Sequence, residues 1–318
     1  MLRWRREALR LTCPRYSVIM KWLVVAVYAA CIAWIQLRGQ VRHRWAKQVF
    51  DHSAFVAPVN VLLYAFSLVP ARPYLALDSW PDLRQLQTHW RTIRDEANAL
   101  RAERALKAAE KNDDAGFNSF FKEGWKRFYL KWYDADPVSA ARLCPRTVEI
   151  LRGVPSVKGA LFAELPPGAK LNPHRDPFAG SLRYHLGLDT PNDDRCCIWV
   201  DGEFYSWRDG QAVVFDETFI HWARNGTDKS RLILLCDIER PMKFRWAAAF
   251  NHWLGRHLLA AAASPNQQGD RTGLINRVFV VFYHAGQLRR RFKQWNRTVY
   301  RVTKFALVAA VVAAIVFW

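Results

Sequence analysis

The sequence has few acidic residues and no paired cysteine motif. Its 28 Asp and Glu stand against 47 Lys and Arg, which gives a formal net charge of +19. The six cysteines, at positions 13, 31, 144, 196, 197 and 236, form no CxxC pair and no regular spacing. This argues against a zinc site or a disulfide framework. Cys196 and Cys197 lie in an apolar run, so we interpret them as buried reduced thiols in a reducing compartment.

The composition also lacks the signs of a disordered chain. Of the 318 residues, 51% are hydrophobic and 14% aromatic, which is enough for one large core together with membrane-contacting segments. The positive charge suits an anionic partner, either nucleic acid or a phospholipid surface. Fifteen Trp and apolar runs at both ends favour the membrane. No known nucleic-acid-binding motif is present, so we expect no nucleic-acid partner, and we infer no obligate protein partner.

The N-terminal region predicts a membrane anchor. A basic segment, 1–17, precedes a transmembrane helix at 18–37, whose centre WLVVAVYAACIAWI carries no charge. No small-residue cleavage site follows the apolar run, so we expect an anchor that is not removed. Arginines flank the run on both sides, and the positive-inside rule therefore gives no orientation.

Two further segments are expected to touch the membrane. The juxtamembrane region 38–78 contains the apolar stretch 54–69, which fits an interfacial or re-entrant helix about as well as a second span. Residues 287–318 join a basic stretch to the uncharged run FALVAAVVAAIVFW, and they predict a C-terminal membrane helix that binds lipid headgroups.

The middle of the chain predicts a mainly β catalytic core. Residues 79–123 form a helical support region, in which Ser79 is expected to cap a helix with Pro81 and Asp82 in its first turn. Short apolar strands separated by turn clusters fill 124–245, and a C-terminal extension covers 246–286. We therefore predict an α+β fold: a double-stranded β-helix (jelly roll) with flanking helices and membrane-attaching terminal helices.

Three residues have the spacing of a metal site. His174 and Asp176 stand two positions apart, so on an extended chain both project from one face, and His221 follows 45 residues after Asp176. Two His and one carboxylate that leave coordination positions open form the facial triad of non-heme Fe(II) oxygenases. We predict that these three residues bind Fe(II).

The position of one basic residue, Arg231, predicts a co-substrate in addition to the metal. Arg231 lies ten residues after His221 and opens the apolar strand RLILLCD, where a guanidinium can hold a carboxylate with two hydrogen bonds. Iron ligands followed by such a residue are typical of 2-oxoglutarate oxygenases. The predicted cofactors are therefore Fe(II) and 2-oxoglutarate, with O2 as co-substrate.

Longer runs resemble a known family. HRDPFAGSLRYHLGLDTPN, VDGEFYSWRDG, FDETFIHWARNGT and CDIERP are similar to the aspartyl/asparaginyl β-hydroxylase family, and within it to the bacterial lipid A 2-hydroxylases. The resemblance implies that Arg183 and Arg231 both contact 2-oxoglutarate. His185 either lines the same pocket or is a packed core histidine. A Ser that contacts 2-oxoglutarate in the peptide-hydroxylating members falls at Ala163 here, so that contact is not carried over.

By this resemblance, the chain hydroxylates the 2-position of a fatty acyl chain of lipid A and releases succinate and CO2. It would act on lipid A or another anionic membrane lipid, at the cytoplasmic face of the bacterial inner membrane. Two alternatives remain open: a membrane-anchored peptidyl Asp/Asn β-hydroxylase, and a non-catalytic jelly-roll protein that binds lipid. The carboxylate of Asp176 favours the lipid-modifying members, because the similar peptide hydroxylases lack a ligand there.

Overall fold

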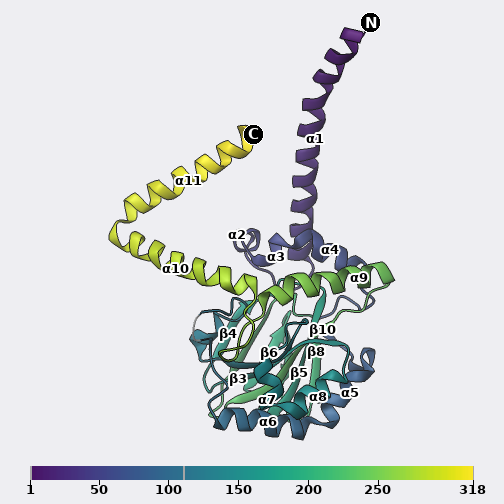
Figure 1. The fold of residues 1–318 in the computed structure, drawn as a ribbon, viewed down its shortest axis with the longest axis vertical. Coiled ribbons are helices and arrows are strands. Elements are labelled where there is room, and N and C mark those ends of the chain that lie inside the picture. Colours follow the sequence, from purple (N-terminus) through teal and green to yellow (C-terminus); the bar gives the residue numbers. More distant parts are fainter. Residues whose placement is uncertain (1, 110–111, 318) are drawn as a thin grey trace.

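Two antiparallel β-sheets form the centre of the molecule in the computed structural model, which describes residues 2–109 and 112–317 (Figure 1). The larger sheet has six strands in the order β1-β8-β5-β10-β3-β2, and the smaller has four in the order β4-β9-β6-β7. The strands are β1 Tyr74–Leu75, β2 Lys126–Trp132, β3 Val157–Leu165, β4 Lys170–His174, β5 Ser181–Asp189, β6 Cys196–Val200, β7 Glu203–Ser206, β8 Ala212–Phe215, β9 His221–Asn225 and β10 Arg231–Glu239. This arrangement confirms the predicted jelly-roll core.

The six-stranded sheet is buried on both faces, which explains its continuous apolar strands. One face carries Leu182, Tyr184 and Leu186 of β5 and packs against the supporting helices. The opposite face turns toward the four-stranded sheet, and the alternate β5 residues Arg183 and His185 lie there. Polar side chains that alternate along β5 are therefore directed into the space between the sheets.

The supporting helices begin later than the sequence predicts. Ser79 ends a short 3-10 turn and caps no helix, while the Asp82 carboxylate accepts hydrogen bonds from the backbone N–H and the hydroxyl of Ser156, both at 2.9 Å. The helical elements are η1 Leu77–Ser79, η2 Pro81–Leu83, α5 Arg84–Thr88, α6 Trp90–Ala102, η3 Phe120–Glu123, α7 Val138–Leu143 and α8 Pro145–Arg152. The prediction that Ser79 caps this helix is wrong, because Pro81 and Asp82 lie in the separate 3-10 helix η2, whose N-cap is Trp80, and α5 begins only at Arg84.

The N-terminal helix α1, Leu2–Leu37, includes the predicted span and stands out from the β core (Figure 1). Among the described residues, one segment is long and apolar enough to cross a membrane, Ile19–Leu37, and almost all of it is exposed. Its base is fixed to the core, because Arg38 forms an ion pair with the buried carboxylate of Asp216. The backbone N–H groups of Gln40 and Val41 also donate to the Asp201 carboxylate, at 2.9 and 2.8 Å.

Residues 54–69 form no single long helix. They fall in α3, His52–Phe55, and α4, Ala57–Ala65, which follow the short helix α2, Trp45–Val49. Asn60 of α4 is buried, donates to the carbonyl of Pro177 at 2.8 Å and accepts from the N–H of Ala179 at 3.0 Å. These contacts fasten α4 to the loop that follows the predicted iron ligands.

The chain ends in helices on the same side of the β core as α1 (Figure 1). They are α9 Arg245–Leu254, the π-helical turn η4 Gly255–Leu259, the 3-10 turn η5 Ala260–Ala262, α10 Leu274–Trp295 and α11 Arg297–Phe317. The predicted C-terminal membrane helix falls on α10 and α11. The side chains of 307–309 and 311–317 lie outside those described, so the membrane helix stays a prediction.

The cysteine interpretation is confirmed where the structure describes side chains. Cys196 and Cys197 are buried on β6 as free thiols, as are Cys144 and Cys236 elsewhere in the core. Burial raises the pKa of Cys196 to about 11, which keeps it protonated and unreactive near neutral pH.

Candidate active site

A cavity between the two sheets brings all six predicted site residues together. It is lined by His174 at the end of β4, Asp176 in the following turn, His221 at the start of β9, Arg183 and His185 on β5, and Arg231 on β10. Aromatic and aliphatic side chains close the remaining walls: Phe117, Phe120, Trp125, Leu171, Ile198, Trp207, Phe215, Ala223 and Leu235. The cavity is thus mostly apolar with a few convergent polar groups, as ligand sites usually are.

The three predicted iron ligands meet at one end of this cavity. One ligand atom from each of His174, Asp176 and His221 lies within 4.8 Å of the others. His174 and His221 are paired across β4 and β9, and their ring centroids are 4.2 Å apart. The N–H of Asp176 donates to the carbonyl of Glu217 at 2.9 Å, which fixes the turn that presents the carboxylate.

Both imidazoles are held in the tautomer that a metal requires. The Nδ1 of His174 is 2.7 Å from the carbonyl of Asn172, and the Nδ1 of His221 is 3.0 Å from the carbonyl of Phe219. Because a carbonyl only accepts, each Nδ1 must carry the hydrogen. Each Nε2 therefore keeps a free lone pair, which is how a backbone carbonyl commonly orients a metal-binding His.

The electrostatics keep these groups ready for a cation. Burial lowers the pKa of His221 to about 3, so its ring is neutral at physiological pH. Burial alone would raise the pKa of Asp176, but the positive charge of Arg183 holds it at about 2. Two neutral imidazoles and one carboxylate suit a divalent metal such as Fe(II).

Arg183 is surrounded by carboxylates. Its guanidinium forms ion pairs with Asp176 and Glu217, and with Asp237 at 2.7 Å. Burial would lower the pKa of Arg183, yet the three acids together raise it well above its usual value. Burial, together with repulsion from the neighbouring carboxylates, raises the pKa of Glu217 and of Asp237. Arg183 therefore positions Asp176, the predicted iron ligand, and its charge is already neutralised by the protein's own acids.

Arg231 has the opposite environment. Its side chain is buried, its guanidinium carbon lies 4.3 Å from the centre of the Trp207 ring, and its Nε has no hydrogen-bond partner. Among the described residues no carboxylate forms an ion pair with it. Burial lowers the pKa of Arg231 to about 10, so the group remains charged at neutral pH. A buried, unpaired cation is costly unless an anion completes it.

His185 supplies a second unpaired donor. The Nε1–H of Trp207 donates to His185 Nδ1 at 3.3 Å, so the hydrogen of the neutral imidazole must sit on Nε2. That buried Nε2 has no partner. Burial, followed by the charges of Arg231 and Arg183, lowers the pKa of His185 well below its usual value. This favours the cavity role over the core role that the sequence left open.

The two ends of the cavity are joined by ring contacts. His221 lies 5.7 Å from Phe215, Phe215 lies 5.0 Å from His185, and His185 lies 5.9 Å from Trp207, centroid to centroid. Ala163, on β3, is fully buried and offers only a methyl group. The unpaired Nε2 of His185 and Nε of Arg231 are thus the donors available where the resemblance predicts a missing Ser contact.

The sequence did not reveal several residues that shape the site. Glu217 and Asp237 surround Arg183, and Trp207 orients both Arg231 and His185. Arg175, between two of the ligands, donates to the carbonyl of Ile35 at the base of α1, at 3.1 Å. The local sequences WRDG, which begins at Trp207, and FDET, which contains Glu217, gave no signal for these roles. The roles depend on how the strands pair.

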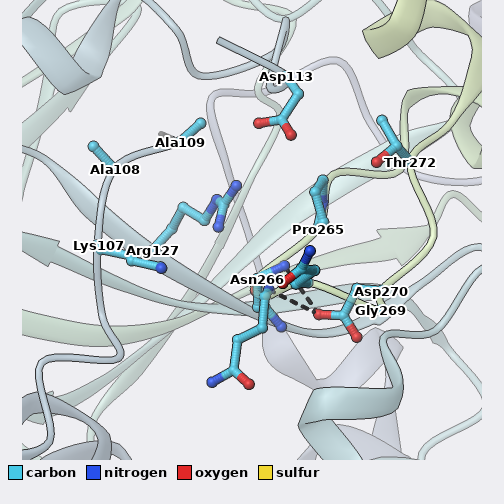
Figure 2. A pocket seen from close by; sticks show the side chains of 12 residues that line it. Lys107, Ala108, Ala109, Asp113, Arg127, Pro265, Asn266, Gly269, Asp270 and Thr272 are labelled. Atoms are coloured by element: carbon cyan, nitrogen blue, oxygen red, sulfur yellow. Dashed lines mark hydrogen bonds between the residues drawn. The ribbon is translucent and has the colours of Figure 1, made fainter. Parts of the chain in front are cut away.

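A second hollow, of about 440 Å³, is lined by none of the triad residues (Figure 2). Its buried Arg127 donates to Asp114 at 2.9 Å and to Ser264 at 2.7 Å. Asp270 accepts from the N–H of Asn266 at 3.0 Å and from the hydroxyl of Ser139 at 2.6 Å. These contacts tie the extension after α9 to β2 and α7, so we interpret this region as structural.

Comparison with known proteins finds matches over the segment that contains the candidate site. Residues 87–241 match the family described as Aspartyl/Asparaginyl beta-hydroxylase, and this segment includes all six site residues. Over 130 residues the chain is 36% identical to the ornithine lipid ester-linked acyl 2-hydroxylase of Rhizobium tropici, covering 41% of this chain and 46% of that protein. It is 28% identical over 164 residues to the aspartyl/asparaginyl beta-hydroxylase of Homo sapiens, covering 50% of this chain and 21% of that protein.

The chain spans half or less of the length of these curated relatives. Among solved structures, a Pseudomonas putida prolyl-4-hydroxylase aligns with a TM-score of 0.32 and 18% identity, over 49% of this chain and 88% of that one.

Proposed function

We propose that this chain is an Fe(II)- and 2-oxoglutarate-dependent oxygenase that hydroxylates a fatty acyl chain of a membrane lipid, because residues 87–241 match the aspartyl/asparaginyl β-hydroxylase family. One observation carries the proposal. A single cavity holds a His-Asp-His triad at one end and two unpaired buried donors, from Arg231 and His185, at the other.

The residues fit both groups. His174, Asp176 and His221 would hold the iron, since two free Nε2 lone pairs and a carboxylate converge there. Arg231 and His185 would bind the distal carboxylate of 2-oxoglutarate, which would neutralise the buried guanidinium and accept the hydrogen of His185 Nε2. When bound, the two groups supply the oxidation: O2 is divided between substrate and co-substrate, so that C–H becomes C–OH and 2-oxoglutarate becomes succinate and CO2.

The chain's own residues prepare this chemistry. Arg183 holds Asp176 as an anion and fixes its orientation, so the carboxylate meets the metal without a proton. Phe120 packs against the His174 ring, with centroids 4.9 Å apart, and restricts the motion of that ligand. The apolar wall of Phe215, Leu235 and Trp125 excludes water from the reacting centre.

A membrane lipid is the substrate class that we favour. A relative named as an ornithine lipid acyl 2-hydroxylase supports an acyl chain as the site of reaction, and the family resemblance adds lipid A as a specific candidate. The apolar segment Ile19–Leu37 would keep the enzyme at the bilayer where such lipids reside. We further propose oxidation at carbon 2 of the acyl chain, on the cytoplasmic face of a bacterial inner membrane, where 2-oxoglutarate is available.

The test is mass spectrometry of total lipids from bacteria that express the full chain. Lipid A and ornithine lipids are resolved separately, and His174→Ala and Arg231→Met variants are compared at equal membrane levels. Val138→Ala, an exposed position on α7, serves as the matched control. We expect one extra oxygen on an acyl chain with the wild type and the control, and none with the two site variants.

An unchanged lipid profile, together with 2-oxoglutarate turnover by the purified protein, would contradict the lipid substrate and leave the oxygenase chemistry standing. The peptidyl hydroxylase then becomes the leading alternative, since a human relative bears that name. Absence of both lipid oxidation and 2-oxoglutarate turnover would favour a non-catalytic lipid-binding protein.

A further inference from the structure

Large apolar side chains are exposed on one side of the catalytic domain. They come from the segment 45–68, which holds the short helices α2 to α4, from Phe244 and from α9 with the turn η4. We call this surface the platform, and its exposed members are Trp45, Val49, Phe50, Phe55, Leu62, Leu68, Phe244, Trp246, Trp253 and Leu258. Phe50 is 81% exposed and Trp253 is 52% exposed. Grouped exposure of this kind marks an interaction surface.

The platform lies where a membrane crossed by α1 would meet the domain. Helices α2, α3, α4 and α9 form a layer over the β core on the side from which α1 leaves (Figure 1). The hydroxyl of Tyr28 on α1 donates to the carbonyl of Phe55 at 2.6 Å, and the Trp34 ring packs 5.2 Å from that of Tyr64. Tyr28 lies roughly 13 Å along the helix from the end of the apolar segment, at 1.5 Å per residue. Helix α3 therefore lies beside part of the segment that would enter the bilayer.

The charge of the platform suits anionic lipid headgroups. Between residues 38 and 72 the only acid is Asp51, and between 240 and 260 there is none. The Asp51 carboxylate is used within the fold, where it accepts from the N–H of Ser53 at 2.9 Å and caps α3. Exposed bases stand among the apolar side chains: Arg42, Arg44, Lys47, Arg72, Lys243 and Arg245. Tryptophan together with Arg and Lys is the composition of a membrane interface.

The platform also touches the iron-ligand segment directly. The ammonium group of Lys47, on α2, donates to the carbonyl of Pro173 at 3.3 Å, and the ring of His52, on α3, lies 2.6 Å from the carbonyl of Arg175. These two carbonyls flank His174. The surface that faces the membrane is therefore continuous with one wall of the candidate active site.

We propose that the platform sits in the headgroup and upper acyl layer of an anionic bilayer, so that an acyl chain can enter the cavity while its lipid stays in the membrane. The acyl-chain part rests on the proposed function, whereas the seating on the bilayer does not. The occupant is a lipid surface, in preference to a second protein, because the apolar and basic side chains surround the base of a membrane-crossing helix.

The experiment measures depth in the full chain reconstituted into lipid nanodiscs. A nitroxide is attached at Phe50→Cys or Trp253→Cys, with Val138→Cys as the matched control, since Val138 is 73% exposed on α7 at the opposite side of the domain. The unsubstituted chain, labelled in parallel, reports the background from the native cysteines. Collision with O2, which concentrates in lipid, is compared with collision with a water-soluble nickel chelate.

We expect labels at 50 and 253 to favour O2 and the label at 138 to favour the nickel chelate. The preference at 50 and 253 should be stronger in discs that contain phosphatidylglycerol than in pure phosphatidylcholine. Labels at 50 and 253 that are as water-accessible as the label at 138 would overturn the proposal. Protection from both relaxants would also overturn it, because that result indicates a protein partner, and equal depth in the two lipids would overturn the role of anionic headgroups.

A second measurement separates this proposal from the proposed function. In a Phe50→Ser/Trp253→Ser variant, we expect several-fold less oxidation of membrane lipid while Fe(II) and 2-oxoglutarate bind as in the wild type. Unchanged lipid oxidation would contradict delivery through the platform. If the labels lie in lipid but the wild type oxidises no lipid, the proposed function fails and the membrane seat stands.

Discussion

Arg183 and Arg231 are buried on adjacent strands, β5 and β10, yet their surroundings are opposite. Three carboxylates surround Arg183, and no described carboxylate pairs with Arg231. The sequence favours Arg231, which lies ten residues after His221, whereas the contact of Arg183 with the cofactor is predicted only by the family resemblance. This difference in surroundings shows that burial and positive charge alone do not identify a cofactor-binding arginine. We propose that the unpaired cation binds the co-substrate, while the saturated one holds the predicted iron ligand Asp176 in place.

The largest effect should come from the metal end of the cavity. His221→Ala removes one of three iron ligands, and we expect Fe(II) affinity and hydroxylation to fall by more than about 100-fold, beyond the range typical of outer-shell partners. Metal analysis after anaerobic reconstitution measures the loss. Trp222→Phe, next to His221 and stacked on Trp199 at 5.7 Å, is the control and should keep its iron. Full iron content in His221→Ala would contradict the ligand assignment.

The second prediction compares the two arginines by stability. Arg183→Met leaves the buried Glu217 and Asp237 and the partly exposed Asp176 without their cation, and we expect it to lower the free energy of unfolding by about 3–5 kcal/mol. Arg231→Met removes an unpaired buried charge and should leave the stability of the cofactor-free protein unchanged or higher. Chemical denaturation of both variants in the same detergent measures the difference. Equal destabilisation by the two substitutions would contradict the different roles that we assign to the two arginines.

The third prediction concerns Asp216, where two arginines pair with one carboxylate, the reverse of the arrangement around Arg183. Burial would raise the pKa of Asp216, but Arg240 and Arg38 together lower it below its usual value. A carboxyl group with a lowered folded-state pKa stabilises the protein above its unfolded pKa, and this stabilisation is lost as the pH falls toward the folded value. We expect stability to decline below about pH 4. Asp216→Asn should decline less over that range, and denaturation at several pH values measures this.

The smallest effect is expected at His185. Replacing it with Leu removes one neutral donor to the cofactor, which corresponds to about 1 kcal/mol, or roughly a fivefold rise in the KM for 2-oxoglutarate. The kcat should change less, because the iron ligands are untouched. Steady-state kinetics with varied 2-oxoglutarate tests this, and His185→Gln, which keeps an N–H donor, should recover part of the loss.

Much of the β core could be predicted from the sequence, since buried strands appear as uninterrupted apolar runs. The three candidate iron ligands could also be predicted from the sequence, because His174 and Asp176 are close along the chain and His221 follows an apolar strand. Short strands such as β4 and β9 were not predicted, because β4 has no buried position and β9 mixes buried and exposed ones, so neither forms an apolar run.

The surroundings of the arginines could not be predicted in the same way. Arg183 faces Asp237 only because β5 and β10 pair in one particular register, and register is set by packing across the sheet. The pairing of Arg38 with Asp216 joins positions 178 residues apart. No local pattern encodes such a contact, so the saturation of one arginine and the isolation of the other emerge only in three dimensions.

The most direct test of this account is an anaerobic titration of the Fe(II)-loaded full chain with 2-oxoglutarate, followed by the visible charge-transfer band of the chelate. Wild type and Arg231→Met are compared at matched iron content. We predict that both load iron equally and that the variant binds 2-oxoglutarate about 30-fold more weakly or worse, equivalent to the 2 kcal/mol or more lost when a buried charge pair is broken. Equal affinity for 2-oxoglutarate in the two proteins would contradict the assignment of Arg231 as its carboxylate-binding group.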